Sequence, residues 1–269
     1  MKKILVPTDF SPLADHALAY AIELGGAFNS ELLLYHVYHV SKVDYNRDFP
    51  ADEQPLKKEL ERKMELTQLK FQESVAEKGL RLQGKVAREP ILALFERKVE
   101  EHEIDLMVIG SKGASGLKKV IFGSVAGTAL NMAKIPVFII PPESTTGLIK
   151  HIVLAVDKHT ISKAVLAPLH QLAVAFGAKV TMLNVKTETT AAAIRKSSID
   201  LEGVESTYQE VPLSNTINDT ISKFVKTNAC DLLCMVRRDK GFFERLLQGS
   251  NTVNQAYRNQ LPLLVLPEV

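Results

Sequence analysis

Glycine and serine residues recur at a fixed spacing between residues 110 and 124 of this chain. Gly110 and Gly113 are followed after nine intervening residues by Gly123 and Ser124, which gives the pattern Gly-x2-Gly-x9-Gly-Ser. Glycine allows a backbone to approach a ligand closely, and the first N–H groups of a helix have no intrahelical partner. The pattern therefore indicates a phosphate-binding loop. A glycine-rich turn followed by a serine N-cap is the alternative that needs no ligand.

The residues on either side predict that this loop connects a strand to a helix. The wholly apolar run Leu106–Ile109 is typical of a strand buried on both faces of a parallel sheet. Residues 125–130 repeat small and apolar side chains at helical spacing, so a helix is expected to begin beside Ser124. A strand, a glycine loop and a helix N-terminus in succession form an arrangement that binds phosphate.

An acidic residue follows the first apolar run of the chain. Residues 4–7 predict a strand, and Asp9 comes directly after it. If this strand neighbours the Leu106 strand, Asp9 faces the same crevice as the glycine loop and can accept hydrogen bonds from ribose hydroxyls. A turn or capping role for Asp9, ahead of a helix that begins at Ser11 and Pro12, is the alternative.

Composition narrows the class of protein. The 269 residues carry a net charge of +2, so no strongly basic field favours nucleic acid as a partner. The N-terminus lacks the apolar core of a signal peptide, and no apolar run has the length of a membrane span, so we expect a cytoplasmic protein with no membrane partner. The two cysteines, Cys230 and Cys234, lie in an apolar run where we expect both to be buried, without disulfide or metal.

The chain contains an internal repeat. Residues 4–9 resemble residues 152–157 at an offset of 148, and residues 104–109 resemble residues 230–235 at an offset of 126. The second copy is therefore shorter by 22 residues between its second and fourth strands. A segment rich in proline, serine and threonine separates the copies, at residues 141–147. We predict two tandem domains, 1–143 and 148–269.

Within the first copy, predicted strands alternate with predicted helices. This alternation indicates a parallel sheet with helices on both faces and a ligand site at the carboxyl ends of the strands. The first helix is expected to close at Gly25 and Gly26, and residues 38–55 to form a loop. Strands are predicted at residues 4–7, 32–37, 80–86, 106–109 and 137–140, and further helices at 56–78, 90–101 and 125–130.

Five segments of the first copy form a recognisable set: Pro7-Thr8-Asp9, Tyr35-His36-Val37, Asp105 to Gly110, the glycine pattern and Pro136 to Ile140. Together these segments resemble the universal stress proteins, and the resemblance extends over both copies. The resemblance implies two doubly wound five-stranded parallel sheets in the order 3-2-1-4-5, similar to the adenine nucleotide alpha hydrolases, which form an intramolecular pseudo-dimer. It implies ATP bound by Asp9 at the ribose, by the Val37 backbone at adenine and by the glycine loop at the phosphates. The predicted site residues are Pro7, Thr8, Asp9, Val37, Gly110, Ser111, Gly113, Gly123, Ser124 and Val125.

The same resemblance implies a regulatory protein of the stress response more than a catalyst. ATP with Mg²⁺ is the expected ligand, AMP is the alternative, and a homodimer or pseudo-dimer is the expected assembly. No general base that would position a water molecule is evident, so at most slow ATP hydrolysis is expected. Arg88 departs from the family, which commonly has glycine there.

The second copy departs from the glycine pattern. Asp157 and the pair Gly249-Ser250 are kept, but Val236 and Asp239 stand where the first two glycines would be. Valine adds bulk, and aspartate places negative charge towards a phosphate. We therefore predict one nucleotide site per chain, in the first copy, with the second copy available to pack or to bind a protein partner.

Other functions remain as alternatives. A nucleotide-activating enzyme of the nucleotidyltransferase or ATP pyrophosphatase type, and a nucleotide-free interaction scaffold, are both compatible with this architecture. Residues 79–86 superficially resemble a Walker A loop, but Val86 stands where Mg²⁺ binding needs Ser or Thr. His36 and His39 could suggest a metal site, but their spacing on a strand end points them apart and no cysteine or carboxylate pair joins them.

Overall fold

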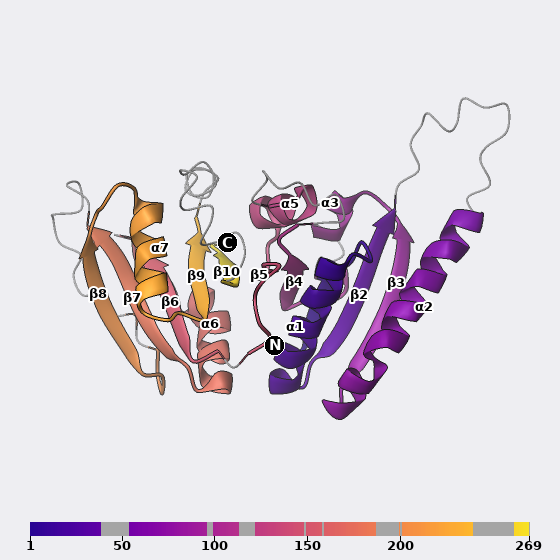
Figure 1. The fold of residues 1–269 in the computed structure, drawn as a ribbon, viewed down its shortest axis with the longest axis horizontal. Coiled ribbons are helices and arrows are strands. Elements are labelled where there is room, and N and C mark those ends of the chain that lie inside the picture. Colours follow the sequence, from indigo (N-terminus) through magenta and orange to yellow (C-terminus); the bar gives the residue numbers. More distant parts are fainter. Residues whose placement is uncertain are drawn as a thin grey trace, which may run out of the picture.

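The computed structural model contains one ten-stranded sheet with helices on both faces (Figure 1). It describes residues 1–38, 54–95, 99–112, 122–147, 149–157, 159–186, 199, 201–238 and 261–268. The strands lie in the order β3-β2-β1-β4-β5-β10-β9-β6-β7-β8, which within each half of the chain is the order 3-2-1-4-5. The predicted α/β class with two halves in tandem is confirmed.

The first half supplies the strands and helices on the right of Figure 1. Its elements are β1 (Lys3–Pro7), α1 (Pro12–Phe28), β2 (Glu31–Tyr38), α2 (Gln54–Glu77), β3 (Arg81–Arg88), α3 (Ile91–Ala93), α4 (Val99–Glu101), β4 (Leu106–Gly110), α5 (Ser124–Met132) and β5 (Val137–Ile140).

The second half repeats this succession with a shorter second connection. Residues 39–80 connect β2 to β3, whereas only residues 187–205 connect β7 to β8, so the predicted deletion falls there. Its elements are β6 (His151–Val156), α6 (Lys163–Phe176), β7 (Lys179–Lys186), β8 (Ser206–Pro212), α7 (Ile217–Thr227), β9 (Leu232–Arg237) and β10 (Leu263–Pro267).

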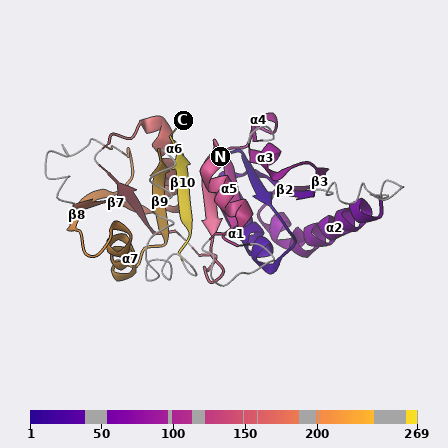
Figure 2. The ribbon, with the colours of Figure 1, turned by 90° about the horizontal axis from the view of Figure 1, so that it is seen from above.

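Alternation of side chains along the strands builds one core on each face of the sheet. In β1, Ile4 and Val6 pack with α1 and α2, whereas Leu5 packs on the opposite face with α3, α4 and α5. α6 lies on the face of α1, and α7 lies on the face of α5. Figure 2 shows the helices on the two sides of the sheet from above. Because both faces are covered, the central strands need continuous apolar runs, as Leu106–Ile109 provides.

The two halves join through their last strands. β5 and β10 pair antiparallel, with Phe138 opposite Leu264, while the pairs described inside each half are parallel. The hydrogen bonds of this antiparallel pair join the two five-stranded halves into a single sheet.

Helix α1 begins where the sequence predicts and ends later. Ser11 is its N-cap, with the hydroxyl accepting the Ala14 N–H at 3.2 Å. The predicted stop at Gly25 and Gly26 is wrong, because the helix continues to Phe28 and ends at Asn29 in the left-handed conformation with φ of 52°. Gly25 instead allows close packing, since a Cβ there would lie 3.1 Å from side-chain atoms of Leu32 and Leu80.

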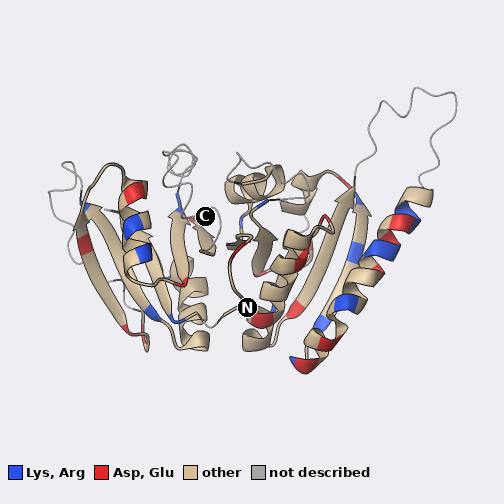
Figure 3. Ribbon diagram, viewed as in Figure 1, with Lys and Arg blue, Asp and Glu red and all other residues tan. Residues whose placement is uncertain are grey.

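Helix α2 carries charges of both signs along its exposed face (Figure 3). Two ion pairs hold this segment against α1: Lys70 of α2 with Asp15 at 2.6 Å, and Lys78, just after the end of α2, with Glu23 at 2.8 Å. These pairs are mostly exposed, so they orient α2 more than they stabilise it. The buried residues Leu60, Met64 and Val75 supply its apolar contacts.

The segment between the halves is fastened to α1. The Ser144 hydroxyl donates to the Pro141 carbonyl at 2.7 Å and lies 3.2 Å from Nε2 of His16. The Tyr20 hydroxyl donates to the Thr145 carbonyl. The predicted linker is thus anchored to α1 at Ser144 and Thr145, while most of residues 141–147 are exposed.

Several predictions extend past the described residues or differ in detail. Residues 39–53 and 96–98, within the predicted 38–55 loop and 90–101 helix, lie outside them.

Cys234 is buried as expected, but Cys230 is only half-buried, and both thiols are free. Burial raises the pKa of both thiols, that of Cys230 to about 12, so neither forms a reactive thiolate near neutral pH. In the described part of the chain, every helix is too short or too polar to cross a bilayer.

Candidate functional site

A pocket of about 300 Å³ opens at the carboxyl end of the sheet in the first half. Its walls come from the ends of β1, β2 and β4 and from the start of α5. The strand order reverses between β1 and β4, and ligands bind at such a switch point in doubly wound folds. The lining residues are Pro7, Thr8, Asp9, Ala14, Tyr35, His36, Val37, Ile91, Ile109, Gly110, Lys112, Gly123, Ser124, Val125 and Ala126.

The predicted site residues gather at this pocket. Ser111 is buried and does not line it, and Gly113 lies outside the described residues. That these residues bind a ligand stays a prediction. The members that do line the pocket are Pro7, Thr8, Asp9, Val37, Gly110, Gly123, Ser124 and Val125.

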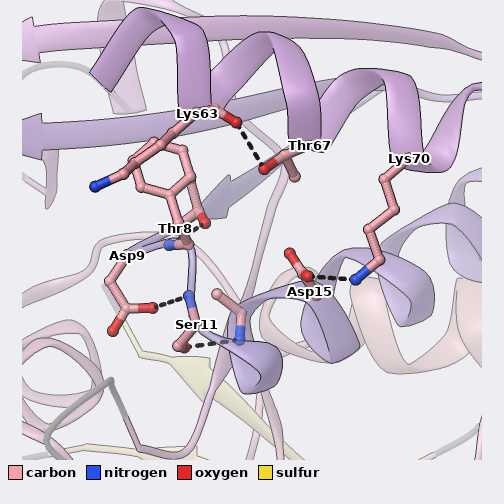
Figure 4. Close-up of polar contacts among 9 residues, drawn as sticks. Thr8, Asp9, Ser11, Asp15, Lys63, Thr67 and Lys70 are labelled. Atoms are coloured by element: carbon pink, nitrogen blue, oxygen red, sulfur yellow. Dashed lines mark hydrogen bonds and ion pairs between the residues drawn. The ribbon is translucent and has the colours of Figure 1, made fainter. Parts of the chain in front are cut away.

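A tight turn holds Asp9 at the pocket (Figure 4). The Thr8 N–H donates to the Tyr35 carbonyl at 2.9 Å, and the Thr8 hydroxyl accepts the Phe10 N–H at 3.0 Å. Asp9 Oδ1 accepts the Ser11 N–H at 3.0 Å. Phe10 has φ of 61°, which is unusual for a side chain of this size. Asp9 therefore has the turn role considered from the sequence, and it also lines the pocket, so the two roles are compatible.

His36 supports this turn from β2. Its Nδ1–H donates to the Thr8 carbonyl at 2.7 Å, and its ring lies 4.5 Å from the Phe10 ring, centroid to centroid. Burial lowers the pKa of His36, and the positive charge of Lys63 lowers it further, whereas the Thr8 carbonyl and Asp9 oppose this. His36 is therefore a neutral hydrogen-bond donor to the turn, which accounts for it without a metal.

We expect the protein to lose stability in mild acid through His36. Since the pKa of His36 is lowered in the folded chain, the unfolded chain takes up a proton at a pH where the folded chain does not. The contribution of His36 to the free energy of unfolding is therefore complete above about pH 6.5 and decreases as the pH falls below that value. Urea unfolding followed by circular dichroism, at about pH 7.5 and about pH 5.5, should show a smaller pH dependence in His36→Asn. The same pH dependence in wild type and variant would contradict the assignment.

The close packing of α1 against the end of β4 requires a glycine at residue 110. A Cβ at Gly110 would lie 2.9 Å from Leu13 Cγ and 3.2 Å from the Leu13 carbonyl oxygen in α1. The backbone of Ser111 then connects the strand to the helix beyond the loop, because its N–H donates to the Ile140 carbonyl and its carbonyl accepts the Gly123 N–H, both at 2.8 Å. The predicted loop thus begins and ends at fixed points, although residues 113–121 are outside the described chain.

The N-terminus of α5 faces the pocket without a side-chain cap. Gly123 is the N-cap, with φ of −62° and ψ of 166°, and Ser124 is the first helical residue. The alternative in which Ser124 caps the helix is wrong, because Ser124 lies inside the first turn and its hydroxyl is exposed. With no N-cap side chain accepting their hydrogen bonds, the first N–H groups of α5 suit an anion.

One positive side chain at the pocket was missed from the sequence. Lys112 is half-buried, follows Gly110-Ser111 and lines the pocket, as Ser124 does. The feature of the sequence that could have identified Lys112 is its position between the first two glycines of the pattern. Two further lysines of the predicted loop, Lys118 and Lys119, are outside the described residues. Apolar residues at the pocket, such as Ile91 and Ala126, give it a second, uncharged wall.

The equivalent crevice of the second half contains an arginine. Arg238, the counterpart of Lys112, lies 3.4 Å from Asp157 and 3.3 Å from Glu268 in ion pairs. It also donates to the His159 carbonyl at 3.2 Å. Asp157, the counterpart of Asp9, is therefore neutralised by its own half of the chain. Asp239, Gly249 and Ser250 lie outside the described residues.

The described side chains do not form a metal cluster. Over the ranges that the structure describes, no group of three or more His, Cys, Asp or Glu side chains is placed to hold an ion. His39, which was weighed with His36, is outside those ranges.

Comparison with known protein families gives two matches to one family model. The model described as the Universal stress protein family matches residues 1–141 and again residues 148–267. A universal stress protein of Methanocaldococcus jannaschii is 32% identical over 146 residues, which are 52% of this chain and 81% of that protein. The universal stress protein YxiE of Bacillus subtilis is 29% identical over 147 residues, which are 51% of this chain and 97% of that protein.

A solved structure matches both halves together. A universal stress protein from Archaeoglobus fulgidus superposes with a TM-score of 0.73, at 19% identity, over 98% of this chain and 98% of that chain. At this identity the similarity concerns the fold alone. That fold includes both halves.

Proposed function

Because this chain belongs to the universal stress protein family, with two copies of the family domain in tandem, we propose that its first half binds ATP. In this proposal the protein is a nucleotide-responsive regulator of the stress response. ATP acts as a ligand that binds two conformational or assembly states unequally, which is the condition for shifting the balance between them. Residues 1–143 and 148–269 are the two domains.

The observation that carries the proposal is the chemistry of the pocket walls. The uncapped N-terminus of α5, Lys112 and Asp9 all line a single pocket. The first two favour a polyphosphate, whereas a carboxylate suits ribose hydroxyls. The apolar wall suits a purine base, with the Val37 backbone as its hydrogen-bonding edge.

Each predicted residue has a proposed role at this pocket. Asp9 accepts from the ribose, and Pro7 and Thr8 shape the turn that presents it. The amides of Gly110, Gly113 and the first residues of α5 surround the phosphates, and Ser111, whose N–H donates to the Ile140 carbonyl, holds the start of the loop in place. A Mg²⁺ ion would be held mainly by phosphate oxygens and water, in keeping with its preference for few protein ligands.

The second half is proposed to bind no nucleotide. The ion pair between Arg238 and Asp157 occupies the carboxylate that a ribose would need. The buried Val236 replaces the glycine at the end of the strand. This half is free to pack against the first half or to bind a protein partner.

Matched aspartate variants test the proposal. Asp9→Asn keeps the oxygen that accepts the Ser11 N–H but removes the charge, and we expect it to weaken ATP binding about tenfold. Asp157→Asn, at the equivalent position of the second half, should leave ATP affinity unchanged. Isothermal titration calorimetry and native mass spectrometry with MgATP should give one ATP per chain for the wild type.

Three outcomes would contradict the proposal. Two ATP molecules per chain at similar affinity would mean that the second half also binds nucleotide. No ATP bound by the wild type would favour the scaffold alternative. Turnover of ATP at about ten or more per second, the rate of an ordinary enzyme, would favour a nucleotide-activating enzyme.

A further inference from the structure

One side chain of the second half reaches the helix that borders the pocket of the first half. Arg237, the last residue of β9, donates from Nη1 to the Leu130 carbonyl at 2.6 Å and from Nη2 to the Ala133 carbonyl. These carbonyls lie at the C-terminal end of α5, where helical carbonyls lack intrahelical partners. A guanidinium group suits this end because its planar fork donates two hydrogen bonds and its charge complements the helix dipole.

Arg237 is half-buried, and burial lowers its pKa. A charge that is partly removed from water is favourable only where protein groups replace the lost hydration, and the two α5 carbonyls do so here. The contact is therefore a specific one between the halves, unlike an exposed ion pair.

The opposite end of the same helix borders the pocket. α5 is nine residues long, about 14 Å, and its first residues, Ser124, Val125 and Ala126, line the pocket. Only three side chains of α5 are buried in the core, Ala126, Ala129 and Leu130, and two of them are alanines. A short helix held by so little apolar surface depends on its ends. One end is held at Gly123 by the Ser111 carbonyl and the other by Arg237.

The support runs from the second half to the first. In the internal repeat, Arg237 corresponds to Ser111, whose short hydroxyl is buried and has no hydrogen-bond partner among the described residues. Ser111 is too short to form the fork that Arg237 forms. Because the second half has arginine where the first half has serine, the second half contacts the end of α5 in the first half. Ser111 makes no equivalent contact with the described part of the second half.

We propose that Arg237 is a positioning residue for the phosphate subsite of the first half. By fixing the C-terminal end of α5, it sets where the N-terminal N–H groups of that helix lie against the nucleotide phosphates. The inference rests on the proposed function, and it makes the second half a necessary part of the nucleotide site although it binds no nucleotide itself.

The test compares a ligand with phosphates to one without. Arg237→Met removes the fork and keeps an unbranched side chain, and Arg237→Lys keeps the charge but not the fork. We expect Arg237→Met to weaken MgATP binding about tenfold in calorimetry and to leave adenosine binding unchanged, with a smaller loss of MgATP affinity in Arg237→Lys. Amide hydrogen exchange in residues 124–132 should be faster in Arg237→Met without nucleotide.

Lys134→Met is the matched control, since Lys134 lies just beyond α5 but pairs with Glu100 at 2.9 Å. It removes a nearby charge without removing the fork, so MgATP affinity should be kept. Unchanged MgATP binding in Arg237→Met would overturn the inference, and so would an equal loss of MgATP and adenosine affinity, which would indicate general disruption of the first half. If the wild type binds neither ligand, the proposed function fails and this inference fails with it.

Discussion

Ser124→Glu is expected to weaken ATP binding by a factor of about one hundred or more while leaving the fold intact. The substitution places a carboxylate in the exposed first turn of α5, on the wall of the pocket. A negative charge there is favourable for the helix itself, because it complements the positive end of the helix dipole. The same charge within about 4 Å of a phosphate costs several kcal/mol in a partly desolvated pocket. Binding and stability should therefore change independently.

Ser124→Gln is the control, since it has the same length without the charge. We expect it to keep most of the ATP affinity, and the loss in Ser124→Glu to shrink as ionic strength rises. Calorimetry measures the affinities, and urea unfolding followed by circular dichroism measures the stability. Equal affinity in Ser124→Glu and wild type would mean that the phosphates lie elsewhere.

The elements of this fold could be predicted where local pattern and tertiary burial require the same residues. Leu106–Ile109 is a strand in the sequence because it is apolar throughout, and it is covered on both faces in the structure for the same reason. Ser11 and Pro12 begin α1 as their local chemistry predicts. The pocket could be located in the same way, because strand order and the glycine spacing both point to the ends of β1 and β4.

The errors concern residues whose role is set by distant contacts. Gly25 does not end α1, because its lack of a side chain serves packing against Leu32 and Leu80. Ser124 does not cap α5, because Gly123 already has the extended conformation that an N-cap needs. The local sequence alone does not distinguish a glycine that ends a helix from one that allows close packing. It also does not distinguish a serine that caps a helix from one inside the first turn.

The two arginines at the end of β9 illustrate the same limit. Arg237 and Arg238 are adjacent, yet one contacts α5 in the first half and the other pairs with Asp157 in its own half. Successive residues at the end of a strand point to opposite sides, so adjacent arginines can have unrelated partners. Only the placement of the two halves decides which partners these are.

Gly110→Val is expected to destabilise the first half by about 1–3 kcal/mol, the usual cost of overpacking a filled core. The added Cβ would lie 2.9 Å from Leu13 Cγ and 3.2 Å from the Leu13 carbonyl, so both a side chain and a helix backbone must move. The second half has Val236 at the equivalent place and tolerates it. Five positions separate Asp157 from the N-cap Ser162 of α6, whereas two separate Asp9 from Ser11. The longer connection starts α6 later, and we infer that this gives the second half room for a valine.

A double-mutant cycle between Gly110 and Leu13 tests this explanation. Gly110→Ala adds the Cβ alone, and Leu13→Ala removes the side-chain atoms that it would meet, so the pair should show a favourable coupling of about 0.5–3 kcal/mol. Gly127→Ala is the control, because a Cβ at Gly127 meets nothing within 4 Å, and alanine in a helix interior should stabilise α5 by up to about 1 kcal/mol. Urea unfolding of the four variants gives the comparison. Additive effects at Gly110 and Leu13 would mean that the glycine is needed for the ligand and not for the approach of α1. In that case Gly110→Ala would weaken ATP binding without lowering the free energy of unfolding.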